Sequence, residues 1–223
     1  IHPYPAFCLR FRKPPLWQAA WQYAGRDSSG NPCELSVPGE HRVLEVGPGR
    51  FPWPRANMYV DVVSDYASRA AENHGGNCLV RDVTRLPDDW DKVFDLVLCS
   101  HVLEHVSDPL QACRELSRVA KAGVIVCPSP MTDALFAIHE PTHRWWVWPV
   151  GESKVLRFQK IPEDYKRFVA SGDMSGVAHR LYRLGPARLD RDSCIARRWF
   201  HRAEPALSVV LHWSGEIKAE IVD

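Results

Sequence analysis

The stretch VLEVGPG, residues 43–49, joins a short apolar run to a tight glycine turn. Val43, Leu44 and Val46 are typical of a strand that is buried on both faces, as in a parallel sheet. The glycines at both ends of GPG let the backbone turn sharply and approach a ligand closely. An acid, Glu45, stands two residues before the first of them. We therefore expect a strand that delivers a binding loop at its carboxyl end.

Further apolar runs of strand length follow this stretch. They are residues 58–63, 77–80, 94–100 and 123–128. Between the last two we expect a helix, because Asp108 suits an N-cap, Pro109 the first helical position and Gln111 a capping box. We expect Gly123 to end that helix. Strand, helix and strand in this order predict a right-handed parallel crossover, so the fold class is α/β.

The second half of the chain has a different pattern. Residues 144–150 and 154–160 flank a GES turn and predict a hairpin, and residues 162–183 are charged and helical in character. Two strand-like segments, ALSVVLHW and EIKAEIV, end the chain and are expected to be antiparallel. We divide the chain into an N-terminal cap segment (1–41), a core (42–160) and a C-terminal extension that completes or flanks the sheet (161–223).

The composition is that of a soluble globular protein. The chain has 28 basic and 27 acidic side chains, so we expect no nucleic-acid partner. Seven cysteines without a C-x-x-C pair indicate buried thiols in a cytoplasmic protein. No apolar run reaches the roughly 18 residues that a membrane span needs. The first residue is Ile rather than Met, which leaves an upstream targeting segment open. The oligomeric state is also open.

Two strings resemble zinc-protease signatures, HVLEH (101–105) and HEPTH (139–143). Both signatures need their histidines on one face of a continuous helix. HVLEH has room for a single helical turn before the cap at Asp108, and Pro141 biases Glu140 away from the α region. We therefore reject the protease and predict no metal site. A non-protease metal site that uses some of these histidines remains an alternative.

Acidic residues recur where the predicted strands end. Glu45 precedes the glycine turn, Asp61 lies in the next strand, and Asp82 follows the third. The fourth strand ends in Ser100 and His101. In an open parallel sheet the carboxyl ends of the strands meet at one crevice. Carboxylates there accept hydrogen bonds from an ammonium group, from vicinal hydroxyls or from an exocyclic amine.

In order, VLEVGPG, YVDVV, VRDVTRLP and FDLVLCSHVLEHVSDP resemble the successive motifs of class I S-adenosylmethionine-dependent methyltransferases, type 11-like. The resemblance covers residues 42–128. It implies a Rossmann-like, mainly parallel sheet of seven strands, with an antiparallel last strand, and S-adenosyl-L-methionine as cofactor. The implied cofactor contacts are Glu45, Gly47, Pro48 and Gly49 at the methionine part, Asp61 and Val62 at the ribose, Asp82 and Val83 at the adenine, and Ser100 and His101 at the methyl group.

The chain departs from the family pattern in two ways. Phe51 stands where the family often has a third glycine, and the helix after the glycine turn is missing, because Pro52 and Pro54 interrupt residues 50–57. We expect the N-terminal segment with Trp17 and Trp21 to cover that face of the sheet instead. A nicotinamide-binding fingerprint fits less well, since it needs a third glycine where Pro52 stands.

The acceptor side is predicted from the residues that follow the fifth strand. We expect His101, His139 and His143 to be catalytic, because histidine can take a proton near neutral pH. The expected substrate contacts are His105, Arg144, Trp145 and Trp146. The alternatives are that these histidines are structural hydrogen-bonders and that the tryptophans are hairpin core. The predicted function is methyl transfer to oxygen or nitrogen of a small-molecule or glycan acceptor; the alternative is an inactive binding or scaffold subunit.

Overall fold

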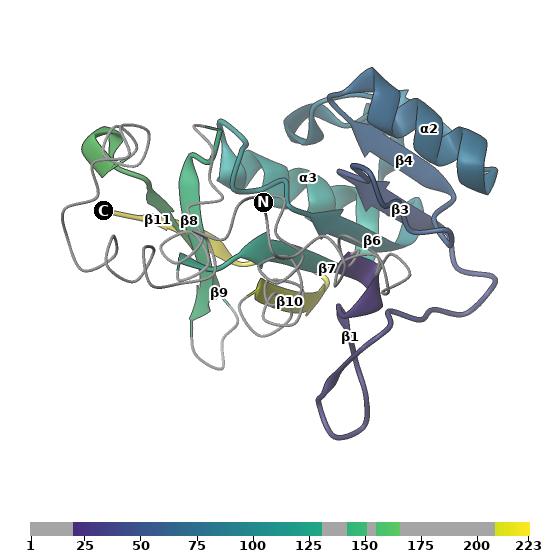
Figure 1. The fold of residues 1–223 in the computed structure, drawn as a ribbon, viewed down its shortest axis with the longest axis horizontal. Coiled ribbons are helices and arrows are strands. Elements are labelled where there is room, and N and C mark those ends of the chain that lie inside the picture. Colours follow the sequence, from purple (N-terminus) through teal and green to yellow (C-terminus); the bar gives the residue numbers. More distant parts are fainter. Residues whose placement is uncertain (1–19, 131–141, 151–154, 166–207) are drawn as a thin grey trace, which may run out of the picture.

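The computed structural model describes residues 20–130, 142–150, 155–165 and 208–223. A six-stranded sheet with the order β10-β7-β6-β3-β4-β5 forms its centre (Figure 1). Its strands are β3 (Val43–Val46), β4 (Met58–Asp61), β5 (Asn77–Val80), β6 (Phe94–Ser100), β7 (Ala120–Pro128) and β10 (Ser208–Ser214). All neighbours pair in parallel except β10 and β7, which are antiparallel. The predicted α/β class with a mainly parallel sheet is confirmed; the described residues supply six of the seven strands that the resemblance implies.

Helix α3 (Pro109–Val119) begins as predicted but ends earlier. The Gln111 N–H donates to Asp108 Oδ1 at 2.9 Å, and Pro109 is the first helical residue. The expectation that Gly123 ends the helix is wrong, because strand β7 begins directly at Ala120 and contains Gly123. A Cβ at Gly123 would lie 2.6 Å from the Val97 carbonyl oxygen, so this glycine allows neighbouring chains to pack closely.

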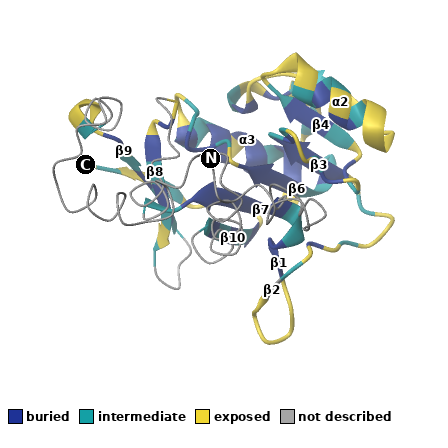
Figure 2. Cartoon of the chain, viewed as in Figure 1, coloured by how far each residue is buried: buried dark blue, intermediate teal, exposed yellow. Residues whose placement is uncertain are grey.

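Helix α2 (Ser64–His74) is an element that the sequence analysis did not predict. It buries only two alanines, Ala67 and Ala70, and exposes most of its outer face (Figure 2). It ends at Gly75, whose positive φ of 75° lets its N–H donate to the Ala71 carbonyl at 2.8 Å. The strand that we expected to run to residue 63 ends at Asp61, and α2 begins at Ser64.

Residues from the N-terminal region cover one face of the sheet, as expected. No helix joins β3 to β4; the connection contains the buried Trp53. Around it lies a buried cluster of Ala20, Tyr23, Ala24, Leu35, Val43, Trp53, Ala56, Tyr59, Ala70, Leu98, Val124 and Val126. Trp21 packs against this cluster, whereas Trp17 lies outside the described residues.

The opposite face carries α3 and a second, smaller sheet. Strands β8 (Trp145–Val150) and β9 (Val155–Lys160) form the predicted hairpin pair. Strand β11 (Ala219–Val222) adds to β9 in parallel, which corrects the expectation that both C-terminal strands are antiparallel. The short elements are η1 (Ala20–Gln22), β1 (Gly25–Arg26), β2 (Pro32–Cys33), η2 (Val83–Arg85) and η3 (Asp88–Trp90).

Two further predictions concern a helix in the second half of the chain and the absence of a membrane span. Most of the helical stretch expected at 162–183 lies outside the described residues. Within the described ranges, no helix has the length and apolar character that crossing a membrane requires.

Candidate functional site

The glycine turn lies against the segment that follows β6. Gly47 and Gly49 have φ values of 73° and 53°, in the region that favours glycine. The Gly47 N–H donates to the Val60 carbonyl at 2.9 Å. A Cβ at Gly47 would clash with Val102 Cγ2 and lie 3.0 Å from the Ser100 carbonyl oxygen. The glycine turn therefore packs against the end of β6 so closely that a side chain at position 47 has no room.

Asp61 lies at the carboxyl end of β4 beside this turn. Its Oδ1 accepts the Val63 N–H at 2.9 Å, and the amides of Gly49 and Val62 also donate to the carboxylate. Partial burial raises the pKa of Asp61, and these amide bonds oppose the increase. The structure thus brings together the glycine turn and the second acidic motif, which are 12 positions apart in sequence from Gly49 to Asp61.

Glu45 points into the protein rather than to its surface. It is 2% exposed, and its Oε2 accepts the Trp53 N–H at 2.7 Å. The Tyr59 hydroxyl donates to the Trp53 carbonyl at 2.9 Å. Glu45 therefore stabilises the connection that replaces the missing helix; its expected contact with the methionine part stays a prediction. Pro48, in the turn, is also buried.

Burial raises the pKa of Glu45 to about 8 from 4.5, although the Trp53 N–H opposes this. The folded protein therefore holds this proton more tightly than the unfolded chain, and it loses stability as the pH rises from about 4.5 to about 8. Glu45→Gln keeps an acceptor for Trp53 and has no proton to lose. We expect the variant to be more stable than the wild type at pH 8 and above, with the difference shrinking towards pH 5.

Urea denaturation across this pH range measures the effect as the difference in unfolding free energy between variant and wild type. Glu72→Gln, on the exposed side of α2, is the matched control and should follow the wild type at every pH. If the unfolding free energy of Glu45→Gln varies with pH in parallel with that of the wild type, the Glu45 carboxyl group does not have the raised pKa.

Asp82 lies after β5 and caps a short helix. Its Oδ1 accepts both the Thr84 N–H and the Thr84 hydroxyl at 2.8 Å, and it remains exposed. Val83, the next residue, is buried. The exposed Asp82 carboxylate can accept a hydrogen bond from a ligand, and the predicted contact of Asp82 and the Val83 backbone with adenine stays a prediction.

Exposed apolar side chains gather at the same edge of the sheet. Among the described residues, the large hydrophobic side chains that are exposed are Phe51, Val62, Val63, Val80 and Ile221. All but Ile221 follow the glycine turn or lie at the ends of β4 and β5. An adenine ring needs apolar surface and ribose hydroxyls need an acceptor, so these side chains and Asp61 fit an adenosine group.

The end of β6 carries the next predicted residues. Ser100 is its last residue and is buried, while the His101 side chain is 40% exposed. His101 has a φ of 53°, an uncommon conformation for a residue with a side chain, and its N–H donates to the Val126 carbonyl at 2.8 Å. Such conformations cluster at functional sites. His101 Nδ1 lies 3.5 Å from Glu104 Oε1.

Glu104 is the centre of a histidine cluster and was not among the predicted site residues. It is fully buried, and His105 Nε2 lies 3.9 Å from its Oε1. The rings of His105 and His143 are 4.6 Å apart. Burial by itself would raise the pKa of Glu104, but His101, His105 and His143 outweigh it and hold the pKa below its usual value. HVLEH contains a signal, since its acid lies between two histidines, but His143 is 39 positions further along than Glu104.

The hairpin residues divide between this cluster and the core. The N–H groups of Arg144 and Trp145 donate to the Glu104 carbonyl at 2.7 and 3.2 Å, and the Arg144 side chain is exposed. Trp145 is buried, and its indole N–H donates to Val106. The hairpin-core alternative therefore fits Trp145. Trp146 is half-buried with its ring against Tyr165, and His139 lies outside the described residues.

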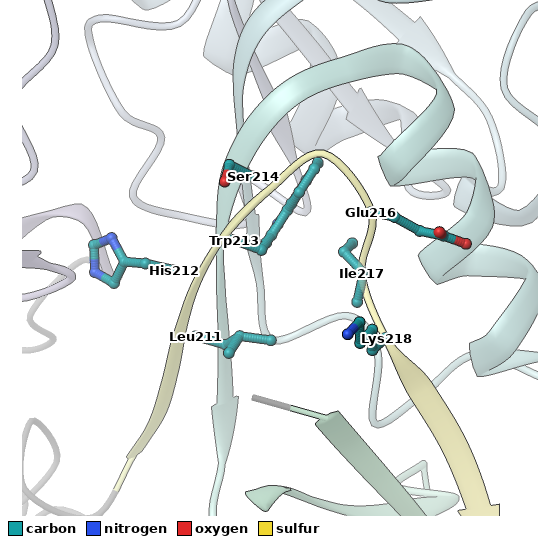
Figure 3. A pocket seen from close by; sticks show the side chains of 7 residues that line it. All are labelled: Leu211, His212, Trp213, Ser214, Glu216, Ile217 and Lys218. Carbon is teal, nitrogen blue, oxygen red and sulfur yellow. The ribbon is translucent and has the colours of Figure 1, made fainter. Parts of the chain in front are cut away.

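A surface hollow lies elsewhere, between β10 and β11 (Figure 3). Leu211, Trp213, Ile217 and Lys218 contribute to it, whereas His212 points away towards Ala24, whose carbonyl its Nε2 contacts at 2.7 Å. Because β10 is antiparallel to β7, its end lies at the edge where β7 begins. No predicted site residue lines this hollow, so we do not assign it to the cofactor.

The family comparison agrees with the fold. Residues 54–127 match the family model described as "Methyltransferase domain". Residues 54–127 thus match a methyltransferase domain, and the mainly parallel sheet agrees with the class I type that the motifs predict. S-adenosylmethionine is the methyl donor that this class implies.

A curated relative is the ubiquinone biosynthesis O-methyltransferase of Ralstonia nicotianae, 26% identical over 171 residues, or 66% of this chain. The chain spans 64% of that relative's length. Two solved structures overlap in part. One is an S-adenosylmethionine-dependent methyltransferase from Thermotoga maritima (18% identity, TM-score 0.42, 60% of this chain and 64% of that one). The other is the YcgJ protein of Bacillus subtilis (20% identity, TM-score 0.40, 79% and 90%).

Proposed function

We propose that this protein transfers a methyl group from S-adenosylmethionine to an oxygen or nitrogen atom of a small-molecule or glycan-type acceptor. The observation that carries the proposal is the position of Asp61. Its carboxylate lies beside the Gly47–Gly49 turn and among exposed apolar side chains, at the carboxyl edge of a parallel sheet. This edge is where open α/β sheets bind their ligands.

The bound cofactor supplies an electrophilic methyl group, and the chain's own residues position the partners. Asp61 accepts hydrogen bonds from the ribose hydroxyls, and the open backbone of the glycine turn allows close approach of the methionine part. His101, at the end of β6, takes the proton that the acceptor loses. Glu104, whose Oε1 lies 3.5 Å from His101 Nδ1, orients the His101 ring and stabilises its protonated form.

The acceptor is proposed to bind beside residues that follow β6 and β7. His105 and Arg144 lie beside His101 and Glu104 and contribute polar groups to this side of the site. Oxygen is the favoured acceptor atom, because the curated relative is named as an O-methyltransferase. His143 and Trp146 belong to the same region, and a catalytic role for His139 remains part of the proposal.

Isothermal titration calorimetry with S-adenosylmethionine and S-adenosylhomocysteine tests the proposal. We expect binding of one cofactor per chain in the micromolar range, followed by transfer of labelled methyl groups to members of a panel of phenols, sugars and amines. Absence of binding up to millimolar concentration would refute the proposal and favour the inactive scaffold. Binding without transfer to any acceptor in the panel would refute the small-molecule acceptor class.

A further inference from the structure

The two strings that resemble zinc-protease signatures each contribute their last histidine to one place in the fold. His105 ends HVLEH, and His143 ends HEPTH. Neither lies on a ligand-bearing helix, since residues 103–105 form a turn. One ligand atom from each of Glu104, His105 and His143 nevertheless lies within 4.8 Å of the other two. The fold thus assembles a carboxylate and two imidazoles from segments that are far apart in the chain.

Glu104 is the residue that most needs a partner here. It is 0% exposed, and among the described residues neither carboxylate oxygen has a hydrogen-bond partner. A buried carboxylate without compensation costs several kcal/mol, so such groups are paired or coordinate metals. The side chains that approach it are His101 at 3.5 Å, His105 at 3.9 Å and the Cys127 thiol, which is a weak hydrogen-bond donor.

His105 is oriented as metal-binding histidines are. Its Nδ1 lies 3.2 Å from the Thr142 carbonyl, which can only accept a hydrogen bond, so Nδ1 carries the proton. In the neutral ring, Nε2 then presents its lone pair towards Glu104 Oε1, which is also an acceptor. Two facing acceptors need either a proton or a metal ion between them, and at 3.9 Å the two atoms are too far apart for a good hydrogen bond. A backbone carbonyl bound to the far nitrogen is also the usual outer contact of a metal-ligating histidine.

We propose that Glu104, His105 and His143 bind one divalent transition-metal ion, with Zn²⁺ as the preferred metal. Imidazole ligands favour zinc and its d-block neighbours over Mg²⁺, which prefers oxygen ligands and keeps its waters. Tetrahedral coordination brings ligand atoms to about 3.3 Å from one another. The ligand atoms, now up to 4.8 Å apart, must therefore move closer together. The His105 side chain can make this movement because it is 38% exposed.

Among the described residues the ligands number three, so a tetrahedral ion would have one further coordination position. His101, whose side chain is 40% exposed, lies beside the same carboxylate. Three protein ligands with an open position are typical of catalytic zinc sites, whereas structural sites are closed by four. A water molecule would occupy the open position, next to the strand end at which the methyltransferase site is proposed.

Metal binding is tested on the full chain without reference to activity. Protein stripped with a chelator is titrated with Zn²⁺ and, separately, with Mg²⁺ by calorimetry, and its melting temperature is measured with and without Zn²⁺. We expect one Zn²⁺ per chain, a raised melting temperature and no competing Mg²⁺ site. Co²⁺ substitution should give the visible absorption of a tetrahedral nitrogen and oxygen site. His143→Ala should weaken Zn²⁺ binding at least tenfold.

Glu104→Gln should weaken binding similarly, and His105→Asn is a second variant if the glutamine does not fold. His74→Ala removes an exposed histidine on α2 and is the matched control, with unchanged affinity expected. The inference is overturned if the stripped protein binds no stoichiometric Zn²⁺, if it binds Mg²⁺ instead, or if the folded His143→Ala variant binds Zn²⁺ as tightly as the control. Cofactor titrations of the same samples report on Asp61 and the glycine turn separately.

Discussion

Asp61→Asn is expected to weaken S-adenosylhomocysteine binding by about 10–100-fold. The substitution retains an oxygen that accepts the Val63 N–H, so the local turn keeps its 2.9 Å hydrogen bond. It removes the negative charge that strengthens hydrogen bonds from two ribose hydroxyls. Hydrogen bonds to charged groups contribute about 1.5–3 kcal/mol, against about 1 for neutral ones. Calorimetric titration of wild type and variant measures the ratio of dissociation constants.

Asp65→Asn provides the control for this experiment. It is the same chemical change, on an exposed position in the first turn of α2, within the same region of the sheet edge. We expect its dissociation constant to equal that of the wild type. If Asp61→Asn binds as tightly as Asp65→Asn, Asp61 does not hold the ribose, and the proposed location of the cofactor is wrong.

Gly47→Ala is expected to lower the free energy of unfolding by about 2–4 kcal/mol and to weaken cofactor binding in the protein that still folds. Two effects add. The φ of 73° disfavours any residue with a Cβ, and the added methyl group meets Val102 Cγ2 and the Ser100 carbonyl. Relief of that contact separates the turn from the end of β6, where His101 lies. Urea denaturation followed by circular dichroism measures the stability.

Gly75→Ala separates the two effects. Gly75 has a φ of 75°, almost the same conformation, but nothing lies within 4 Å of the position a Cβ would take. It should therefore lose only the conformational part, about 1–2 kcal/mol, and keep cofactor affinity. Equal losses for both variants would show that the glycine turn is not packed against Val102.

Local chemistry made several elements predictable from the sequence. The cap formed by Asp108 with Pro109 and Gln111 acts within one turn of helix, so its residues are sufficient to predict where α3 begins. The glycine turn and Asp61 were likewise predicted to meet, because the ends of adjacent parallel strands converge. Their contact through the Gly49 amide is present in the structure.

Other features depend on contacts that a sequence pattern does not contain. Helix α2 buries only Ala67 and Ala70, so it has no apolar stripe to reveal it. Gly123 looked like a helix end, but close packing against Val97 and Trp213 explains it. The role of Glu104 could not be predicted from the sequence. Its proximity to His143 and its burial are properties of the folded chain.

The position of β3 limits how this protein can be divided for expression. The family match begins at residue 54, after β3, yet that strand lies between β4 and β6 in the sheet. A fragment of residues 54–127 would lack β3 and would therefore expose unpaired edges of β4 and β6. Unpaired strand edges promote self-association. The His212–Ala24 contact joins β10 of this sheet to a segment 188 positions earlier in the chain. Truncation boundaries drawn from sequence homology alone would cut through hydrophobic cores to which residues 20–24 and 209–217 both contribute.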